Sequence, residues 1–416
     1  MTVDHSPASS TKTPPRGWFS ASALWARLPG LSPLGPHEVP VDIDVHAIPK
    51  TSIERRQASV AAASSTRIAS SLKECTNKSR DIPSSKEESV LYLAYGSNLA
   101  AQTFLGMRGI KPLSQISVLV PELHLTFDMP GIPYIEPCFA ATALRNPAAP
   151  GDFEAESKSE SDEDITLVTE SELLAEKTGL VESIRESNPD YTGRHWHKPL
   201  VGVVYEVTLA DYAKIIATEG GGRGYRDTVV DCYPFVDGFK PTDPVPNFPS
   251  TEAFKAHTLL SPNTDEKRKK MRIEGKSDPS AVSVRPYNQS VWTIDVPLRP
   301  DPEWAQPSAR YLNLLRSGAK EHELPFSYQE YLLQLHSFHS TTSRQKVGAV
   351  VFGGLWGPVL LSLLKLGRLF AGPDGRMPGW LAAVQNGVQL LMWHAYDYFY
   401  KWLFGDGERT INDTQF

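Results

Sequence analysis

The sequence predicts an α+β fold for the middle of the chain, and two kinds of pattern support this. Runs rich in β-branched and aromatic residues indicate strands at 90–95 and 200–207. Apolar residues at helical spacing indicate helices at 208–219 and 308–319. The 416 residues, of which 40% are hydrophobic, suffice for one or two sizeable cores and exclude a wholly disordered protein.

Charge and cysteine content narrow the class of protein. A formal net charge of -6 gives no electrostatic reason to expect nucleic-acid binding, which depends on clustered Lys and Arg. Cys75, Cys138 and Cys232 are odd in number and far apart, which excludes a disulfide framework and any C-x-x-C metal or redox pair. We therefore expect a reducing, cytoplasmic compartment. The N-terminus also lacks the layout of a secretory signal.

Residues 1–87 are rich in Ser, Pro and Ala and are predicted to be disordered. Such a segment buries too little apolar surface to offset the entropy lost on ordering. A helical pattern at 53–72 would belong to a transit peptide, a docking helix or a disordered tail. Asp4 and the Pro clusters favour the tail.

Order is predicted to begin near Ser89, in a domain that spans 88–340. Its first strand, at 90–95, ends at a glycine that allows a tight turn. The next elements indicated are a helix at 99–107, strands at 116–127 and 139–144, and a loop at Pro130-Gly131.

Two polar segments are predicted to be insertions in this domain, at about 150–195 and 237–280. The first contains an acidic, Ser-rich run, which is typical of a solvated and flexible loop. The second contains the basic cluster Lys267-Arg268-Lys269-Lys270, which lies beside many acids and favours a surface loop over a nucleic-acid patch. Neither insertion is assigned a catalytic role.

The stretch between the insertions is the most regular. Thr208 opens the helix after the strand at 200–207, and Asp211 follows three residues later in a T-x-x-D capping box. The helix stops at Gly220-Gly221-Gly222, and a strand follows at 226–235. A later helix at 327–339 places on one face Tyr328, Tyr331, Leu332, Leu335 and Phe338.

The C-terminal region, 341–416, is predicted to be helical and apolar. Val347–Leu364 contains no charged residue and has the minimum length of a membrane-spanning helix. Trp380–Phe404 is aromatic but carries charged residues, and suits an interfacial or packed amphipathic helix. Membrane association is slightly favoured. The alternative is that both segments cover an apolar face of the core.

The turn after the first strand, Tyr95-Gly96-Ser97-Asn98-Leu99, is a candidate binding site. Ser97 or Asn98 can cap the helix that follows, and the backbone N–H groups there suit a carboxylate or a phosphate. The pattern is of low specificity, because many capped helices follow strands without binding anything. No G-x-S-x-G pattern surrounds Ser97, which argues against a nucleophilic serine.

Glu219 is a candidate catalytic carboxylate. It shares a helix stripe with Leu209, Tyr212 and Ile216, so it lies on the apolar side of the helix. Loss of hydration there would favour its protonated form, which is the condition for acid–base chemistry. Alternatively, Glu219 escapes to water at a frayed last turn. The glycines after it follow a helix and precede a strand, the reverse of a dinucleotide fingerprint.

Together these residues resemble the γ-glutamylcyclotransferase family. The resemblance rests on Tyr95-Gly96-Ser97-Asn98-Leu99 after a strand, on Gly202-Val203-Val204-Tyr205, and on Glu219-Gly220 with Gly224-Tyr225 beyond. It continues in Pro307–Leu312 and in Gly318-Ala319. It covers roughly residues 89–335, and the long tails are similar to those of fungal members.

The resemblance implies a small mixed β-barrel with surrounding helices. It also implies that Tyr95 to Leu99 hold the γ-glutamyl head group, that Glu219 is catalytic, and that Tyr225 and Tyr311 line the site. No cofactor is expected. A metal is not expected either, because His195 and His197 lack a convincing third ligand. Three glycines follow Glu219 where many members have one, which puts the substrate's size in doubt.

The implied activity is the cyclisation of a γ-glutamyl amino acid or conjugate to 5-oxoproline, with release of the amine. A glutathione-derived adduct is one expected substrate; glutathione itself is less favoured, because its specific branch departs from the Ser-Asn-Leu form found here. Two rivals remain. One is a catalytically silent, membrane-associated scaffold that keeps the fold, and the other is a carrier or sensor that binds γ-glutamyl ligands without turnover.

Overall fold

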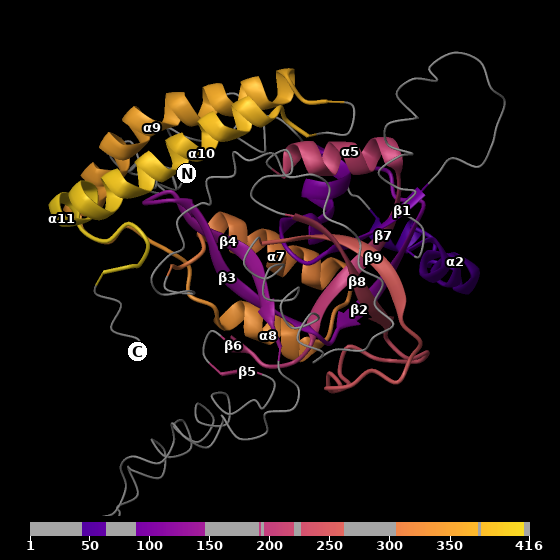
Figure 1. Ribbon diagram of the computed structural model, residues 1–416. Helices are drawn as coiled ribbons and strands as arrows, with labels where there is room; N and C mark the ends of the chain where they lie inside the picture. The colour runs from indigo at the N-terminus through magenta and orange to yellow at the C-terminus, as the bar shows by residue number, and fades with distance from the viewer. Residues whose placement is uncertain are drawn as a thin grey trace, which may run out of the picture.

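Five strands form a closed barrel in the computed structural model (Figure 1). The structure describes residues 44–63, 89–145, 191–192, 195–219, 226–261, 305–372 and 376–411. The barrel strands, in the order in which they pair, are β1 (Ser89–Ala94), β7 (Leu200–Thr208), β2 (Ser114–Val120), β8 (Arg226–Pro234) and β9 (Phe254–Leu260).

The barrel is mixed, as the family resemblance implies. Neighbouring strands are antiparallel except where β9 closes onto β1, with Tyr92 opposite His257 in parallel register. β1 is buried along almost its whole length, because both of its neighbours and the covering helices exclude water from it. The α+β class and the barrel are therefore confirmed.

The segment predicted as one strand at 116–127 is two strands. β2 ends at Val120, and β3 (Leu123–Ile132) pairs with β4 (Glu136–Leu144) in a separate hairpin. Pro130-Gly131 lies inside β3 and not in a loop, with the pairing irregular between Thr126 and Met129. A third small sheet consists of β5 (Tyr191–Thr192) and β6 (His195–Trp196).

Two helices of the domain begin at side-chain caps. Thr208 accepts a hydrogen bond from the Asp211 N–H (3.2 Å) at the start of α5 (Leu209–Thr218). Ser308 accepts one from the Tyr311 N–H (3.1 Å) at the start of α7 (Ala309–Glu321). α8 (Phe326–Gln334) ends five residues earlier than predicted, although the side chains of its predicted apolar face are buried.

The prediction of disorder throughout 1–87 is wrong for residues 44–63. A short 3-10 helix, η1 (Val45–Ala47), and α2 (Ile53–Ala63) lie against the barrel. Arg55 on α2 forms an ion pair with Glu206 on β7 (2.7 Å), and the Lys255 N–H on β9 donates to Ser59 (3.0 Å). Charge pairing and backbone contacts hold this segment to the barrel, and residues 64–72 of the predicted helical pattern lie outside the described residues.

The segment predicted as an insertion at 237–280 contains a barrel strand. β9 buries Phe254, Ala256 and Thr258 in alternation, which is the pattern of a strand with one face on the core. Polar neighbours such as Lys255 and His257 hid this pattern in the sequence. The described part of this segment ends at 261, and most of the acidic insertion at 150–195 lies outside the described residues.

The C-terminal region forms a helical hairpin along one side of the barrel domain (Figure 1). Its elements are α9 (Ser343–Leu369), α10 (Gly379–Ala395), the π-helical turn η4 (Tyr396–Tyr400) and α11 (Lys401–Phe404). A second core joins the hairpin to the turn between β3 and β4. It consists of Tyr134, Ala349, Phe352, Trp356, Met392, Trp393, Tyr396 and Tyr400.

Candidate active site

Two buried tyrosines, Tyr95 and Tyr311, pack against the interior side of the turn after β1. Tyr95 donates its hydroxyl to the Leu259 carbonyl on β9 (2.7 Å). The Tyr311 hydroxyl, from α7, accepts from the Ala140 N–H (3.0 Å), and a Cβ atom added to Gly96 would lie 3.2 Å from it. Both rings are almost wholly buried, whereas Gly96 is half-buried. The turn is therefore held rigidly while one side of it meets solvent.

The turn continues into η2 (Ser97–Leu99), a single turn of 3-10 helix. Gly96 has no side chain to cap it, and no described residue accepts from the N–H of Ser97 or Asn98. The Asn98 side chain is 4% exposed, and its Oδ1 atom has no hydrogen-bond partner among the described residues. The turn thus offers two N–H donors and one amide acceptor. Buried polar groups normally have a hydrogen-bond partner, so these three groups are available to a ligand.

Glu219 lies directly beside this turn. Its N–H donates to the Ile215 carbonyl (3.0 Å), so the backbone stays in register with the last turn of α5. Its Oε1 atom accepts from the Asn98 Nδ2 atom (3.1 Å) and from the Arg108 guanidinium. The structure therefore brings the candidate carboxylate into direct contact with the candidate binding turn.

Asn98 joins Glu219 to the barrel interior. The same Nδ2 atom donates to the hydroxyl of Tyr92 on β1 (2.8 Å). Burial raises the pKa values of Tyr92, Tyr95 and Tyr311, and the negative charge of Glu219 raises each of them further. Three protonated phenols consequently lie within electrostatic reach of one carboxylate.

The environment of Glu219 differs from the one expected of an isolated carboxylate among apolar side chains. The apolar stripe of α5 is buried as predicted, with Leu209, Tyr212 and Ile216 all below 9% exposure. The Glu219 side chain itself remains 20% exposed and forms an ion pair with Arg108. A neighbouring cation and an amide thus replace part of the hydration that the carboxylate loses.

Arg108 and Tyr92 are the site residues that the sequence patterns did not indicate. Arg108 follows the π-helix η3 (Gln102–Met107), and its side chain is only 12% exposed. It also donates to the Thr218 hydroxyl, so it contacts two consecutive residues at the end of α5. The one available signal was its position ten residues after Asn98, at the end of the helical pattern.

A polar cluster behind Tyr92 ties α5 to the barrel. Asp227 on β8 accepts from the Tyr212 hydroxyl (2.8 Å) and lies 2.8 Å from the His257 Nδ1 atom on β9. Arg376, from the connection between α9 and α10, lies 3.7 Å from the second Asp227 oxygen. The C-terminal hairpin therefore contacts the wall of the candidate site.

Tyr225, the other predicted site residue, and the glycines at 220–224 lie outside the described residues. Among the other residues expected at the site, Asn98 and Glu219 are hydrogen-bonded to each other. Gly96 lies against the Tyr311 hydroxyl. Tyr95 and Leu99 are buried beneath the turn. The Leu99 side chain packs in the core, and the Leu99 carbonyl oxygen lies 3.1 Å from the His322 Nε2 atom.

Comparison with known proteins identifies relatives that match most of this chain. Residues 342–402, which are most of the C-terminal hairpin, match a family model described as the AclK C-terminal domain. The γ-glutamyl cyclotransferase gliK of Aspergillus fumigatus is 29% identical over 320 residues, which are 77% of this chain and 89% of that protein. The γ-glutamyl cyclotransferase aclK of Aspergillus oryzae is 27% identical over 338 residues, 78% and 91% of the two chains.

A solved structure titled γ-glutamyl cyclotransferase also matches. It shares 15% sequence identity, the match covers 63% of this chain and 98% of that one, and the TM-score is 0.31.

Proposed function

Because this chain is a homologue of fungal proteins named γ-glutamyl cyclotransferase, we propose that it cyclises a γ-glutamyl amide to 5-oxoproline. The substrate would be a γ-glutamyl amino acid or a γ-glutamyl conjugate, and the other product the released amine. One observation carries the proposal. The Glu219 carboxylate and the Asn98 amide, from elements 121 residues apart in the sequence, are hydrogen-bonded at the edge of the turn after β1.

The proposed reaction needs positioning and one mobile proton. The substrate's α-amino nitrogen attacks its own γ-carbonyl carbon, a C–N bond forms in the five-membered ring, and the original amide C–N bond breaks. Because nucleophile and electrophile are in one molecule, folding the glutamyl chain into the attacking geometry supplies much of the rate. Glu219 accepts the proton lost by the attacking nitrogen and returns it to the departing nitrogen.

The turn supplies the complementary contacts. The N–H groups of Ser97 and Asn98 are suited to the α-carboxylate or to the negative charge that develops on the γ-carbonyl oxygen. The unpaired Asn98 Oδ1 atom is suited to the substrate's amino group. Arg108 keeps the Glu219 carboxylate at the edge of the turn.

The proposal is tested with Glu219→Gln, which keeps the side chain's shape but removes the acid. We expect 5-oxoproline release from a panel of γ-glutamyl amino acids and γ-glutamyl peptides to fall by about 100-fold or more, while calorimetric binding persists. Glu252→Gln, at an exposed carboxylate away from the turn, is the control and should keep full activity. Turnover by the Glu219 variant at the wild-type rate would contradict the assigned role.

The same panel separates the rival functions. Binding of γ-glutamyl compounds by the wild-type chain with no 5-oxoproline released from any of them would reject the enzyme and favour a carrier or sensor. Absence of both binding and turnover would favour a scaffold that only keeps the fold.

A further inference from the structure

Helix α9 is apolar on both of its faces. One face is buried in the second core and includes Ala349, Phe352, Trp356 and Leu363. The opposite stripe is exposed, and its apolar members are Val347, Val350, Val351, Leu355, Val359, Leu366 and Leu369. A helix that is apolar all round is normally covered on all sides. Here a full-length stripe of β-branched and leucine side chains faces outward.

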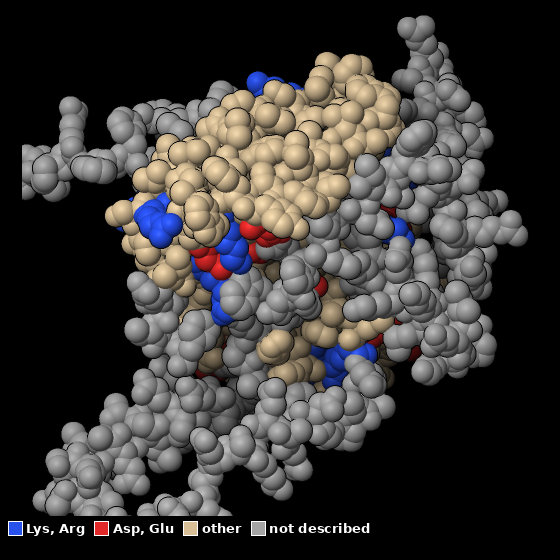
Figure 2. Space-filling model, turned by 60° about the vertical axis from the view of Figure 1, so that its left-hand side comes forward, with Lys and Arg blue, Asp and Glu red and all other residues tan. Residues whose placement is uncertain are grey.

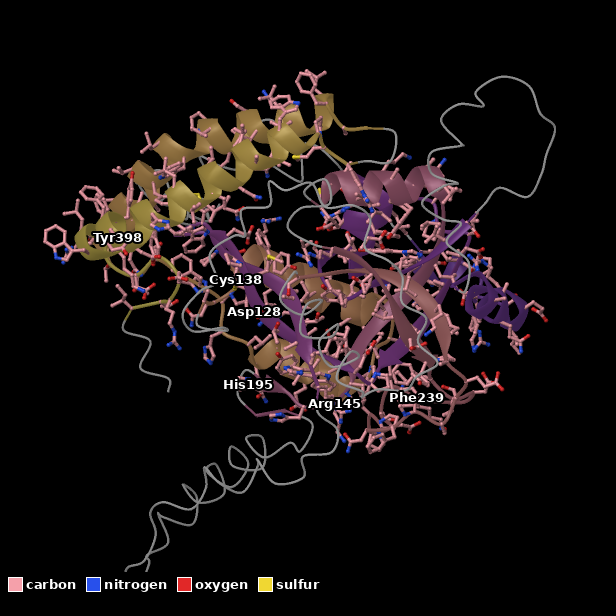
Figure 3. The ribbon with its side chains drawn as sticks, in the orientation of Figure 1. Asp128, Cys138, Arg145, His195, Phe239 and Tyr398 are labelled. Atoms are coloured by element: carbon pink, nitrogen blue, oxygen red, sulfur yellow. The ribbon has the colours of Figure 1, made fainter. Side chains whose placement is uncertain are left out.

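The second half of the hairpin extends the same surface. On α10 and the turns after it, the exposed large side chains are Trp380, Val384, Leu391, Tyr398, Phe399 and Trp402, and four of these six are aromatic. Tyr398 points away from the molecule at the end of the hairpin (Figure 3). Figure 2 shows a broad surface without charged side chains over this region. Exposed apolar surface of this extent marks an interaction site.

The hairpin carries more cationic than acidic side chains, whereas the whole chain has a negative net charge. Residues 343–404 contain six Lys and Arg (Arg344, Lys346, Lys365, Arg368, Arg376 and Lys401) against two acids (Asp374 and Asp397), in a chain whose formal net charge is -6. Two of the six are paired within the molecule, because Arg376 lies against Asp227 and Lys401 against Asp406 and Glu408. Lys346 and Lys365 are exposed near opposite ends of α9. Cations that border an apolar face, with Trp and Tyr among its members, fit the headgroup region of an anionic membrane.

Buried hydrogen bonds attach the base of the hairpin to the barrel domain, so the face directed away from that domain is the one open to a partner. At its base, the fully buried Gln345 donates to the Asp406 carbonyl (2.7 Å) and the Arg409 carbonyl (3.1 Å). The backbone of Glu408 in turn accepts from the Gln306 N–H (2.9 Å) of the barrel domain. Although α9 is long and apolar enough to cross a bilayer, spanning it would require these buried polar groups and the second core to come apart.

We propose that the outer face of the α9–α10 hairpin is a docking surface for an anionic membrane, on which the protein lies without crossing the bilayer. The exposed valines, leucines and aromatic rings enter the interface, and the bordering lysines contact the lipid phosphates. This proposal does not depend on the enzymatic one, because Glu219 and Asn98 take no part in it.

The test is cosedimentation of the full chain with vesicles. We expect the protein to sediment with phosphatidylcholine vesicles containing phosphatidylserine, and less with pure phosphatidylcholine. Leu355→Asp should lower the partition coefficient at least about tenfold, since it places a charge in the apolar stripe. Leu333→Asp is the matched control, because Leu333 on α8 is at least as exposed as Leu355 (66% against 58%). This variant should bind as the wild type does. Lys346→Glu should weaken binding to the anionic vesicles alone.

Three results would overturn the proposal. The first is failure of the wild-type chain to sediment with either kind of vesicle. The second is binding by the Leu355 variant that equals that of the wild type. The third is a wild-type dimer in light scattering that Leu355→Asp converts to a monomer without any vesicle binding, which would assign the face to a second copy of the chain.

Discussion

At the scale of single residues, Arg108 controls where the carboxylate of Glu219 lies. Its guanidinium contacts both Glu219 and Thr218, so its removal loosens the end of α5 and leaves the Asn98 amide as the one remaining partner of the carboxylate among the described side chains. A displacement of about 1 Å at a reacting group can cost about 100-fold in rate. We therefore predict that Arg108→Met lowers kcat/KM for 5-oxoproline release by about that factor.

Arg108→Lys should recover part of this loss, because it keeps the charge but not the forked geometry. Thermal unfolding of both variants distinguishes positioning from stability. If the methionine variant is as active as the wild type, or if the lysine variant recovers nothing, Arg108 does not position Glu219.

His322 predicts a pH dependence of stability. Its Nε2 atom lies 2.7 Å from the Tyr205 hydroxyl, in a buried site at the end of α7, and burial lowers the pKa of His322 from 6.5 to about 4. Between these values the unfolded chain binds more protons than the folded one. The contribution to stability is therefore complete above about pH 6.5 and is lost as the pH falls toward 4, amounting to about 3 kcal/mol.

Urea unfolding at a series of pH values between 7.5 and 4 measures this dependence. His322→Phe removes the titrating group, so its free energy of unfolding should fall less steeply over the same interval. Parallel curves for the two proteins would show that another group is responsible.

The candidate site was predictable from the sequence only where local pattern was enough. Asn98 lies in a short motif and Glu219 at the end of an amphipathic helix, and both could be selected without tertiary information. Arg108 and Tyr92 could not, because an arginine near a helix end and a tyrosine in a strand are ordinary. Their importance arises only from the partners that the fold brings to them.

At the scale of elements, the approach of α7 to η2 places the candidate binding turn. A Cβ atom on Gly318 would lie 2.5 Å from the Leu99 carbonyl carbon and 2.6 Å from the Ala100 nitrogen. Because these are backbone atoms, they cannot move aside without shifting the turn. We predict that Gly318→Ala destabilises the fold by about 1–3 kcal/mol and lowers kcat/KM.

Gly354→Ala, on the exposed side of α9 where an added Cβ meets nothing within 4 Å, is the control for helix propensity. In the control, the free energy of unfolding in urea should be unchanged or slightly higher, and 5-oxoproline release should be unchanged. Wild-type stability and activity in the Gly318 variant would mean that the helix and the turn are not in tight contact.

The elements that sequence patterns missed share a physical cause. The first half of β9 buries alternate residues, and the polar residues between them, Lys255 and His257, made it look like part of a loop. β2 and β3 follow each other across a tight turn at Pro121-Glu122, and a continuous apolar pattern concealed the break. Strands with one covered face depend on partners distant in sequence, whereas the capped helices α5 and α7 are marked by residues within one turn of their ends.

At the scale of the whole molecule, the hairpin and the barrel domain share a hydrophobic core and backbone hydrogen bonds in the described residues. Tyr134, at the turn between β3 and β4, packs in the second core and donates its hydroxyl to the Gly405 carbonyl (2.8 Å). Its N–H donates to the Gly407 carbonyl (2.7 Å). The boundary placed at 341 from composition thus separates segments that share a core and backbone hydrogen bonds.

A chain that ends at residue 341 tests this coupling. It would expose Tyr134, leave the Gln306 N–H without the Glu408 carbonyl, and remove the partner of Asp227 contributed by Arg376. Since burial of one large apolar side chain contributes about 1.5–3 kcal/mol, we predict that the free energy of unfolding falls by at least about 3 kcal/mol. A chain that ends at 411 keeps all of these contacts and should unfold as the full chain does. Urea denaturation followed by tryptophan fluorescence compares the three, and equal midpoints for the chain ending at 341 and the full chain would show that the barrel domain is stable without the hairpin.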